Sequence, residues 1–475
     1  MYVHRSITQF HSEIEDRSIT CAAVVDHYLA CIREKSHLNA FVEVFAEEAK
    51  ERASQLDLKK CQGHPTGRLF GVVVGIKDVI CYKGHRITAG SRMLDNFTSI
   101  INATAVERLL REDAIIIGSL NCDEFAMGSS NENSAHGKVL NPVDETRVPG
   151  GSSGGSAAAV SAGLCMASLG SDTGGSVRQP ADFCGVIGFK PGYGRISRYG
   201  LIAYASSFDQ IGILGTNIDD MALLLEVISG PDGADNTARQ DAVPPYASMI
   251  NTNRKYRIAY FNQALEHPAL DSEIATGIRS FLEKLASEGH EIKGIDVDFL
   301  DHVVPAYYIL TTAEASSNLS RYDGVRYGHR TKENVNDLDE FYKQTRSEGF
   351  GKEVKRRIML GTFVLSTGYF DAYFTKAQQT RQYLHKRTQM IFNDFDIIIL
   401  PTSPTTAFRF GEKSQDAVSM FLADIFTVYA NLTGIPGISF PVGRHSNGMP
   451  FGIMGMSNQK DEVTLLQFAK ASIHE

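Results

Sequence analysis

The stretch GGSSGGSAAAVSAGLCMASLGSDTGGSVRQPADFCGVIGFKPGYGRIS, residues 150–197, joins glycine- and serine-rich loops to segments that are able to pack. Within it, SAAAVSAGL (156–164) predicts a short helix and CMASLG (165–170) predicts a buried strand. Glycine at this density lets backbone N–H groups converge and lets another segment approach closely. A flexible linker has a similar composition, but the packable segments indicate a core built around tight loops.

Ser176 ends SDTGGS (171–176), directly before a segment that is able to form a helix. Pro180 fits this interpretation because proline is tolerated in the first turn of a helix. Backbone N–H groups at such a turn form a nest that favours developing negative charge, as an oxyanion hole must. The expected donors are Thr173, Gly174, Gly175 and Ser176. The local sequence leaves open whether Ser176 is a helix cap or a nucleophile.

The glycine loop PGGSSGGSAAAV (149–160) permits three interpretations. A phosphate-binding loop requires G-x-x-x-x-G-K-[ST], and no lysine follows these glycines. A nucleophile elbow, G-x-S-x-G, is matched at Ser152 and at Ser153, but it requires a strand that leads into the turn. The preceding NPVDETRVPG (141–150) is no strand. The structural interpretation is a cap, by Ser153 or Ser156, before a packed helix.

Lys77 lies inside the apolar run LFGVVVGIKDVI (69–80). Burying an ammonium group is costly, so either the amine extends to water or it is held for a task. Desolvation moves the pKa of a lysine from about 10.4 toward 7–8, and the neutral amine is then a general base. Asp78 points to the opposite face of a strand and need not neutralise Lys77. Together, Lys77 as the base, Ser176 as the nucleophile and the glycine-rich turn as the oxyanion hole would form a catalytic site that needs no histidine.

Buried strands alternate with helices along the chain. Strands are expected at residues 69–80, 114–121, 257–262 and 397–404. Helices are expected between them, as in ATAVERLLRED (103–113) and IDDMALLLEVISG (218–230). This alternation predicts an α/β fold with a large, mixed and mostly parallel sheet that helices cover on both faces.

We expect one domain over residues 1–475. Residues 1–65 are predicted to be helices packed on it, including 20–32, capped by Thr20, and 40–56, whose acidic residues precede its basic ones. Residues 320–357 carry mixed charge and few aliphatic side chains, which predicts a solvated helical insertion.

Composition excludes several classes of protein. The chain of 475 residues is 43% hydrophobic and 21% charged, has a net charge of -8, and contains no apolar run long enough to span a membrane. Proteins that bind nucleic acid directly usually carry an excess of basic residues, and the net charge of -8 therefore argues against this class. The seven cysteines are scattered without a C-x-x-C pair, and no H-E-x-x-H occurs, so neither a disulfide framework nor a metal site is expected. The cytoplasm is the simplest location.

Residues 150–197, together with GIKD (75–78), resemble the amidase signature family. The resemblance implies the amidase signature fold and a Ser–cis-Ser–Lys triad, with Ser176 as nucleophile, Ser152 as bridge and Lys77 as base. It also implies a cis peptide before Ser152. In such a site Ser176 attacks a carboxamide, forms an acyl-enzyme, releases ammonia and is freed by water.

Nearly the full chain resembles one branch of this family, which supplies ammonia from glutamine within a tRNA-dependent amidotransferase. The stretches that carry this resemblance are DEFAMGSSNENSAHGKVLNPVD, SRYGLIAYASSFDQIG, SSNLSRYDGVRYGHR, KRRIMLGTFVLSTGYFDAYF and ADIFTVYANLTGIPGIS. The resemblance implies that Arg357 pairs with the α-carboxylate of glutamine and Asp424 with its α-amino group, with Arg356 as the alternative to Arg357. It places Glu124 near the exit for ammonia; a surface glutamate is the structural alternative.

The same resemblance implies a division of labour. This chain needs no cofactor, whereas a partner uses ATP and Mg²⁺ to activate the glutamate of Glu-tRNA(Gln) and amidates it to Gln-tRNA(Gln). The partners are the amidotransferase subunits B and C, and tRNA is held mainly by the partner. Two alternatives stay open: a stand-alone amidase that hydrolyses small carboxamides, and a catalytically silent scaffold subunit.

Overall fold

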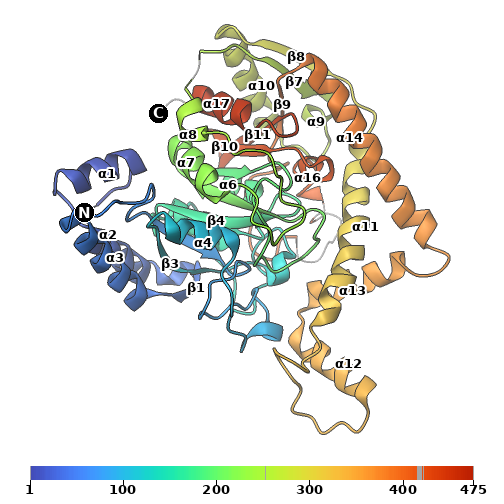
Figure 1. The fold of residues 1–475 in the computed structure, drawn as a ribbon. Coiled ribbons are helices and arrows are strands. Elements are labelled where there is room, and N and C mark those ends of the chain that lie inside the picture. Colours follow the sequence, from blue (N-terminus) through green and yellow to red (C-terminus); the bar gives the residue numbers. More distant parts are fainter. Residues whose placement is uncertain (1, 252, 414–419, 421, 474–475) are drawn as a thin grey trace.

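A sheet of eleven strands runs through the computed structural model, which describes residues 2–251, 253–413, 420 and 422–473 (Figure 1). The strands are β1 Phe41–Val44, β2 Val73–Lys77, β3 Ile115–Leu120, β4 Ala167–Asp172, β5 Ile187–Lys190, β6 Gln210–Gly215, β7 Arg257–Phe261, β8 Glu291–Ile295, β9 Ile397–Pro401, β10 Gly437–Arg444 and β11 Pro450–Ser457. Their order across the sheet is β1-β3-β2-β4-β6-β5-β10-β11-β9-β7-β8.

Helices cover the sheet on both faces, as the α/β prediction requires. They are α1 Ile7–Glu15, α2 Cys21–Glu34, α3 Ala46–Cys61, α4 Thr104–Arg111, α5 Gly154–Ser161, α6 Arg178–Cys184, α7 Ile218–Ile228, α8 Tyr246–Met249, α9 Asn262–Leu265, α10 Ser272–Ser287, α11 Leu300–Asn318, α12 Leu338–Gly349, α13 Lys352–Val364, α14 Lys376–Asp394, α16 Val428–Thr433 and α17 Glu462–Ser472. The mixed α/β architecture predicted from the sequence is confirmed.

The sheet is less parallel than expected. Parallel pairing joins β2 to β3 and β4, and β7 to β8 and β9. The other six pairings among the described strands are antiparallel. A strand that helices cover on both faces is an unbroken apolar run in either direction, so its sequence does not reveal how it pairs.

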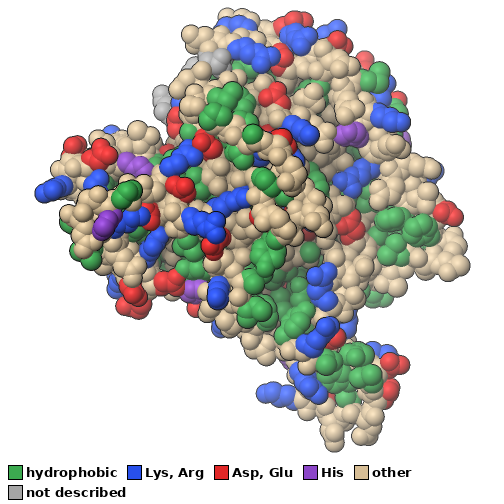
Figure 2. Space-filling model, in the orientation of Figure 1, with side chains coloured by type: hydrophobic (Ala, Val, Ile, Leu, Met, Phe, Trp, Pro, Cys, Tyr) green, Lys and Arg blue, Asp and Glu red, His purple; other side chains and the backbone are tan. Residues whose placement is uncertain are grey.

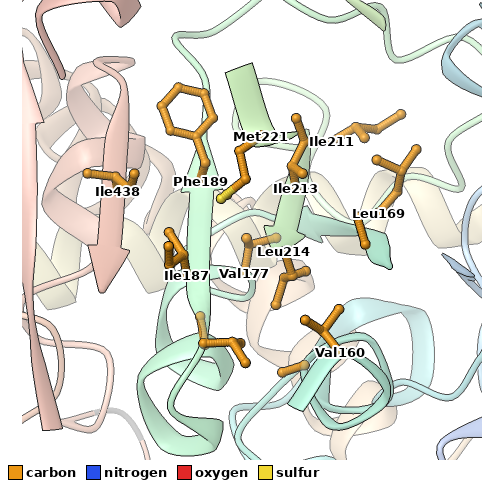
Figure 3. Packing of buried hydrophobic residues seen from close by; sticks show 14 of the residues in the cluster. Val160, Leu169, Val177, Ile187, Phe189, Ile211, Ile213, Leu214, Met221 and Ile438 are labelled. Atoms are coloured by element: carbon orange, nitrogen blue, oxygen red, sulfur yellow. The ribbon is translucent and has the colours of Figure 1, made fainter. Parts of the chain in front are cut away.

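The middle of the sheet holds the loop that carries Ser176. Figure 3 shows Val177 among the apolar side chains of β4, β5 and β6, such as Leu169, Ile187 and Leu214. Val177 fits there because the facing strand positions are glycines: a Cβ added at Gly170, Gly188 or Gly212 would lie 2.6–3.0 Å from a Val177 atom. The core therefore fixes the residue that follows Ser176.

The predicted cap of the second helix is present: Thr20 caps α2, since its Oγ1 accepts from the Ala23 N–H at 3.1 Å. Two other regions that were predicted to be helical differ from the prediction. Residues 41–44 were expected within a helix, and this part of the prediction was wrong: they form edge strand β1, antiparallel to β3. The valines of FVEV are β-branched and favour a strand. The segment 320–357 contains α12 and the start of α13, and its end is not wholly solvated, because Arg357 is buried.

Candidate active site

Lys77 ends β2 with its side chain fully buried. Its Nζ lies near three serine hydroxyls: 2.7 Å from Oγ of Ser152, 2.9 Å from Oγ of Ser153 and 2.9 Å from Oγ of Ser171. Burial lowers the pKa of Lys77 to about 8, although neighbouring Cys122 and several carboxylates act in the opposite direction. A pKa this close to neutrality leaves part of the amine uncharged and able to accept a proton.

The hydroxyl cage restricts which serine the lone pair of a neutral Lys77 faces. Ser153 Oγ donates to Ser171 O at 3.1 Å, so its own proton is in use and it accepts from Lys77. A neutral amine has two N–H donors and one lone pair. When the donors are directed at Ser153 and Ser171, the lone pair faces Ser152 Oγ. The cage thus excludes Ser153 as the proton donor and allows an orientation in which the amine takes the Ser152 proton.

Ser153→Ala is expected to lower kcat/KM for amide hydrolysis by about tenfold to a hundredfold, because a misplaced catalytic group loses rate steeply. The acid limb of the pH–rate profile is expected to move to lower pH, since loss of an acceptor destabilises the charged amine. Ser156→Ala is the matched control: it is buried on the same helix, and its Oγ donates to Leu169 O at 3.2 Å rather than contacting Lys77. An unmoved acid limb in Ser153→Ala would contradict this orienting role.

The backbone brings the loop of Ser152 alongside the loop of Ser176. The Gly151–Ser152 peptide is cis, which confirms the geometry expected from the family resemblance. The Ser153 N–H donates to Ser176 O at 3.1 Å. Lys77 and Ser152 are completely buried, whereas Ser176 is 9% exposed. Ser176 is thus the member of this trio that a molecule arriving from solvent reaches first.

Asp172, the last residue of β4, holds the turn before Ser176. Its carboxylate accepts from the N–H groups of Gly175 at 2.9 Å and Val177 at 3.2 Å. Arg178 adds a two-pronged contact, with Nε at 3.0 Å and Nη2 at 2.9 Å. Burial alone would raise the pKa of Asp172, but the neighbouring Arg178 charge holds that pKa well below its usual range. The turn is therefore braced by a permanent ion pair.

The same bonds select the donors of the expected oxyanion nest. The Gly175 N–H is directed at Asp172. Among the described residues, the N–H groups of Thr173, Gly174 and Ser176 have no protein acceptor. Ser176 lies two residues before α6, which begins at Arg178, so its amide belongs to the turn rather than to the helix. Three of the four predicted donors are thus available to an oxyanion.

Residues from the far end of the chain support this turn. Thr427 Oγ1 donates to Gly174 O at 2.7 Å, and Asn431 Nδ2 donates to Asp172 Oδ1 at 2.9 Å. Gly175 has a φ of +130°, and a Cβ there would lie 2.2 Å from Thr427 Oγ1. The close approach of Thr427 therefore requires glycine at position 175.

Arg357 projects from the buried side of α13. Its Nη1 donates to Tyr204 OH at 2.8 Å and its Nε to Glu353 Oε1 at 2.7 Å. The guanidinium also lies over the rings of Tyr204 and Tyr308, 5.5 Å from each centroid. The neighbouring Arg356 is 43% exposed and pairs with the other oxygen of Glu353 at 2.6 Å. The helix therefore directs Arg357 inward and Arg356 outward.

Asp424 lies on the other side of Tyr308. Its Oδ2 accepts from Tyr308 OH at 2.9 Å and from Ser129 Oγ at 2.8 Å. Burial raises the pKa of Asp424 to about 6, against the effect of these bonds and of Arg357. One phenol thus contacts a buried cation through its ring and a buried carboxylate through its hydroxyl. This pair of opposite charges suits a zwitterionic ligand.

Glu124 is buried at a separate place. Its carboxylate accepts from Ser91 Oγ at 2.5 Å and from the Gly351 N–H at 2.8 Å. Burial raises the pKa of Glu124 to about 7. It lines a pocket of about 270 Å³ together with residues such as Arg92 and Glu353. Since Glu353 also binds Arg357, this pocket adjoins the clamp side of α13.

Several residues of this arrangement were not singled out from the sequence as functional. Ser153 was considered only as a helix cap or elbow serine, yet its side chain makes no cap bond and binds Lys77 instead. Ser171, Asp172 and Tyr308 were not singled out at all. The roles of these three residues depend on partners that are distant in the chain. In addition, Ser171 and Asp172 precede a pair of glycines, where serine and aspartate are ordinary turn residues.

The described part of the chain also bears on metal binding, membrane insertion and disulfide formation. It contains no group of three or more His, Cys, Asp or Glu residues placed to hold a metal ion. None of its helices is long and apolar enough to cross a membrane. The seven cysteines are free thiols in the structure.

Comparison with known proteins gives a consistent result. The profile of the family described as Amidase matches residues 23–466. The chain is 51% identical over 466 residues to the A subunit of the glutamyl-tRNA(Gln) amidotransferase of Chlorobium luteolum, covering 98% of this chain and 96% of the relative. The crystal structure of the corresponding A subunit from Thermotoga maritima is 38% identical, with a TM-score of 0.77 over 93% of this chain and 89% of that one. A peptide amidase from Stenotrophomonas maltophilia shares the fold, with a TM-score of 0.84 and 24% identity over 99% of this chain and 96% of that one.

Proposed function

The chain belongs to the Amidase family, the amidase signature enzymes, and from that premise we propose that it is the glutamine-hydrolysing subunit of a glutamyl-tRNA(Gln) amidotransferase. The observation that carries the chemistry is the fully buried amine of Lys77, 2.7 Å from Ser152 Oγ, in a loop that lies beside Ser176. The identity of 51% to the A subunit of such an amidotransferase supports the choice of glutamine over other amides. All of residues 1–475 act as one amidase domain in this proposal.

The reaction begins with a proton relay. Neutral Lys77 takes the proton of Ser152, Ser152 takes the proton of Ser176, and Ser176 Oγ attacks the side-chain carboxamide carbon of glutamine. The negative charge on the carboxamide oxygen is met by the free N–H groups of the turn, at Thr173, Gly174 and Ser176. The proton returns through Ser152 to the departing nitrogen, the C–N bond breaks and ammonia leaves. Water then cleaves the Ser176 ester by the same relay and releases glutamate.

Glutamine is held by its backbone groups. The α-carboxylate pairs with Arg357 and the α-ammonium with Asp424, whose positions on two sides of Tyr308 support this assignment. The ammonium also compensates for the burial that raises the pKa of Asp424 to about 6, so binding of glutamine favours the ionised carboxylate. A simple carboxamide lacks both charges and does not use the clamp.

Arg357→Met is expected to lower kcat/KM for glutamine by about a hundredfold, because a charged hydrogen bond of about 3 kcal/mol is lost. The same variant is expected to hydrolyse butyramide, which has no α-carboxylate, at the rate of the unmodified protein. Arg356→Met is the matched control, because Arg356 shares Glu353 but points outward. Initial rates with the two substrates decide the assignment. Equal losses on glutamine in both variants would contradict it.

Ammonia released at Ser176 serves a partner. In this proposal the partner subunits B and C complete a heterotrimer, and the partner that binds Glu-tRNA(Gln) uses ATP and Mg²⁺ to convert it to Gln-tRNA(Gln). Glu124 lies where ammonia leaves, at the pocket beside α13. The reaction takes place in the cytoplasm, in keeping with seven free thiols.

The test is a comparison of nitrogen donors. The chain is purified alone and with subunits B and C, and Gln-tRNA(Gln) formation is measured with glutamine, asparagine or ammonium chloride. We expect amidation only in the complex, with glutamine preferred to asparagine and ammonium effective at high concentration. Full turnover of small amides by the single chain, without preference for glutamine, would instead establish a stand-alone amidase.

A further inference from the structure

An exposed group of aromatic side chains lies where α13 is joined to α14. Phe363, Tyr369 and Tyr373 contact one another, with ring centroids 4.5–6.2 Å apart. They are nevertheless 42%, 45% and 39% exposed, and Phe370 is 42% exposed. We define these four residues as the aromatic patch. Figure 2 shows hydrophobic side chains at the right-hand edge of the molecule, over the place where Figure 1 draws this connection.

The local backbone supports a specific use of the patch. Residues Asp371–Thr375 form a π-helix that runs directly into α14. π-Helical turns are rare, and they are frequently found at functional sites. The wider turn changes the directions in which its side chains point. Within it, Tyr373 contacts Phe363 of the preceding helix. Aromatic groups gathered in water in this way mark a surface that another molecule covers.

The surroundings of the patch are basic. On α13, Lys352, Arg356, Met359 and Phe363 follow one another at helical spacing and are all exposed, so a basic and apolar stripe leads to the patch. Lys376 begins α14, three residues after Tyr373, and is exposed. Two acidic residues lie nearby: Glu353 pairs with Arg356 and Arg357, and Asp371, which accepts from Thr375 Oγ1 at 3.0 Å, keeps its charge, so Lys352 and Lys376 leave a small basic excess. A basic margin is unusual on a chain with a net charge of -8.

We propose that the aromatic patch docks an apolar segment with acidic side chains that belongs to a partner subunit of the amidotransferase. This inference rests on the proposed function, which requires such a partner. Charge complementarity selects the occupant: an acidic segment is attracted to the basic margin, whereas a second copy of this chain would bring two basic margins together. Phe363 and Arg357 are on the same helix, one exposed and the other buried, so the docked segment contacts the helix that carries the glutamine clamp.

The experiment measures binding of the full chain to purified B and C subunits by biolayer interferometry. The double variant Phe363→Ser/Tyr369→Ser is expected to weaken binding by about tenfold or more, since aromatic anchors dominate interfaces. Lys376→Glu is expected to weaken it chiefly at low salt, through slower association. Ile100→Ser is the control, because Ile100 is 78% exposed at a different place. Hydrolysis of butyramide by each chain alone is expected to be unchanged, which also shows that each variant is folded.

The outcomes separate this inference from the proposed function. If the unmodified chain assembles and uses glutamine, while the double variant and Lys376→Glu both bind as tightly as the unmodified chain, the proposed docking surface is wrong and the proposed function stands. If the unmodified chain binds neither partner, both fail. Sedimentation that shows a dimer of the unmodified chain, but a monomer of the double variant, would identify a second copy as the occupant and overturn the proposal.

Discussion

Ser176→Ala is expected to abolish glutamine-dependent amidation of Glu-tRNA(Gln) by the assembled complex, with a loss of about 10⁴-fold or more. The hydroxyl of Ser176 is the atom that forms the acyl-enzyme, and neither Ser152 nor Ser153 is able to replace it, because both are fully buried against Lys77. Ammonium chloride bypasses this step, so ammonia-dependent amidation is expected to persist. Gln-tRNA(Gln) formation with each nitrogen donor measures both effects in one preparation.

The persistence of the ammonia reaction is the internal control, because it requires a folded chain and an intact complex. Ser153 N–H donates to the backbone oxygen of residue 176, and this bond does not depend on the side chain. The alanine variant therefore keeps the geometry of both loops. Unchanged use of glutamine by Ser176→Ala would remove the nucleophile from the proposed mechanism. Loss of both reactions would indicate a role in assembly.

Lys77→Met is expected to lower glutamine hydrolysis by about 10³- to 10⁴-fold, because the relay loses its base while an unbranched apolar side chain one atom shorter fills most of the space. In the unmodified protein the rate is expected to rise with pH and to level off above pH 8. The pKa of Lys77 is lowered to about 8, and only the uncharged amine accepts the proton of Ser152. In Lys77→Met the residual rate is expected to lack this acid limb.

Lys190→Met is the matched control for Lys77→Met. Lys190 is also fully buried, and burial lowers its pKa to about 7, but its Nζ donates to the carbonyl oxygens of Pro191 and Ile435. Its replacement leaves two buried carbonyl oxygens without a donor. Each unpaired oxygen is expected to reduce the free energy of unfolding by about 1–3 kcal/mol, so the melting temperature should fall. The folded protein should retain the acid limb. An acid limb near pH 8 that survives in Lys77→Met and disappears in Lys190→Met would reverse the assignment of the base.

The chemistry of the candidate site was more predictable from the sequence than its geometry. A lysine in an apolar strand and a serine after paired glycines are rare enough to be noticed, and the structure brings Lys77 into contact with Ser152. The scaffold was not visible, because it consists of common residues that meet across the fold. Asp172 and Asn431 are 259 positions apart, and nothing local in either segment indicates the other.

The fold was predictable at the level of class and less so in detail. Apolar runs identified β2, β3, β4, β7 and β9 but not the buried strands β5, β6, β10 and β11, and the direction of each strand depends on pairing with distant segments. The edge strand β1 was assigned to a helix because Phe41–Val44 leads into a true helix without a break in sequence pattern. Its β-branched valines favour a strand, and the pairing with β3, which the local sequence does not reveal, makes it one. The choice between Arg356 and Arg357 likewise required the orientation of α13.

The bond from Thr427 to Gly174 spans 253 positions of the chain. During translation the segment with the nucleophile therefore leaves the ribosome long before the residues that brace it. A polypeptide that stalls or is cut before this point lacks the support of Thr427 and Asn431, and its turn is left to fluctuate. Hydrolysis is therefore expected to require synthesis to proceed beyond Asn431, and a chain released before that point is expected to leave glutamine intact.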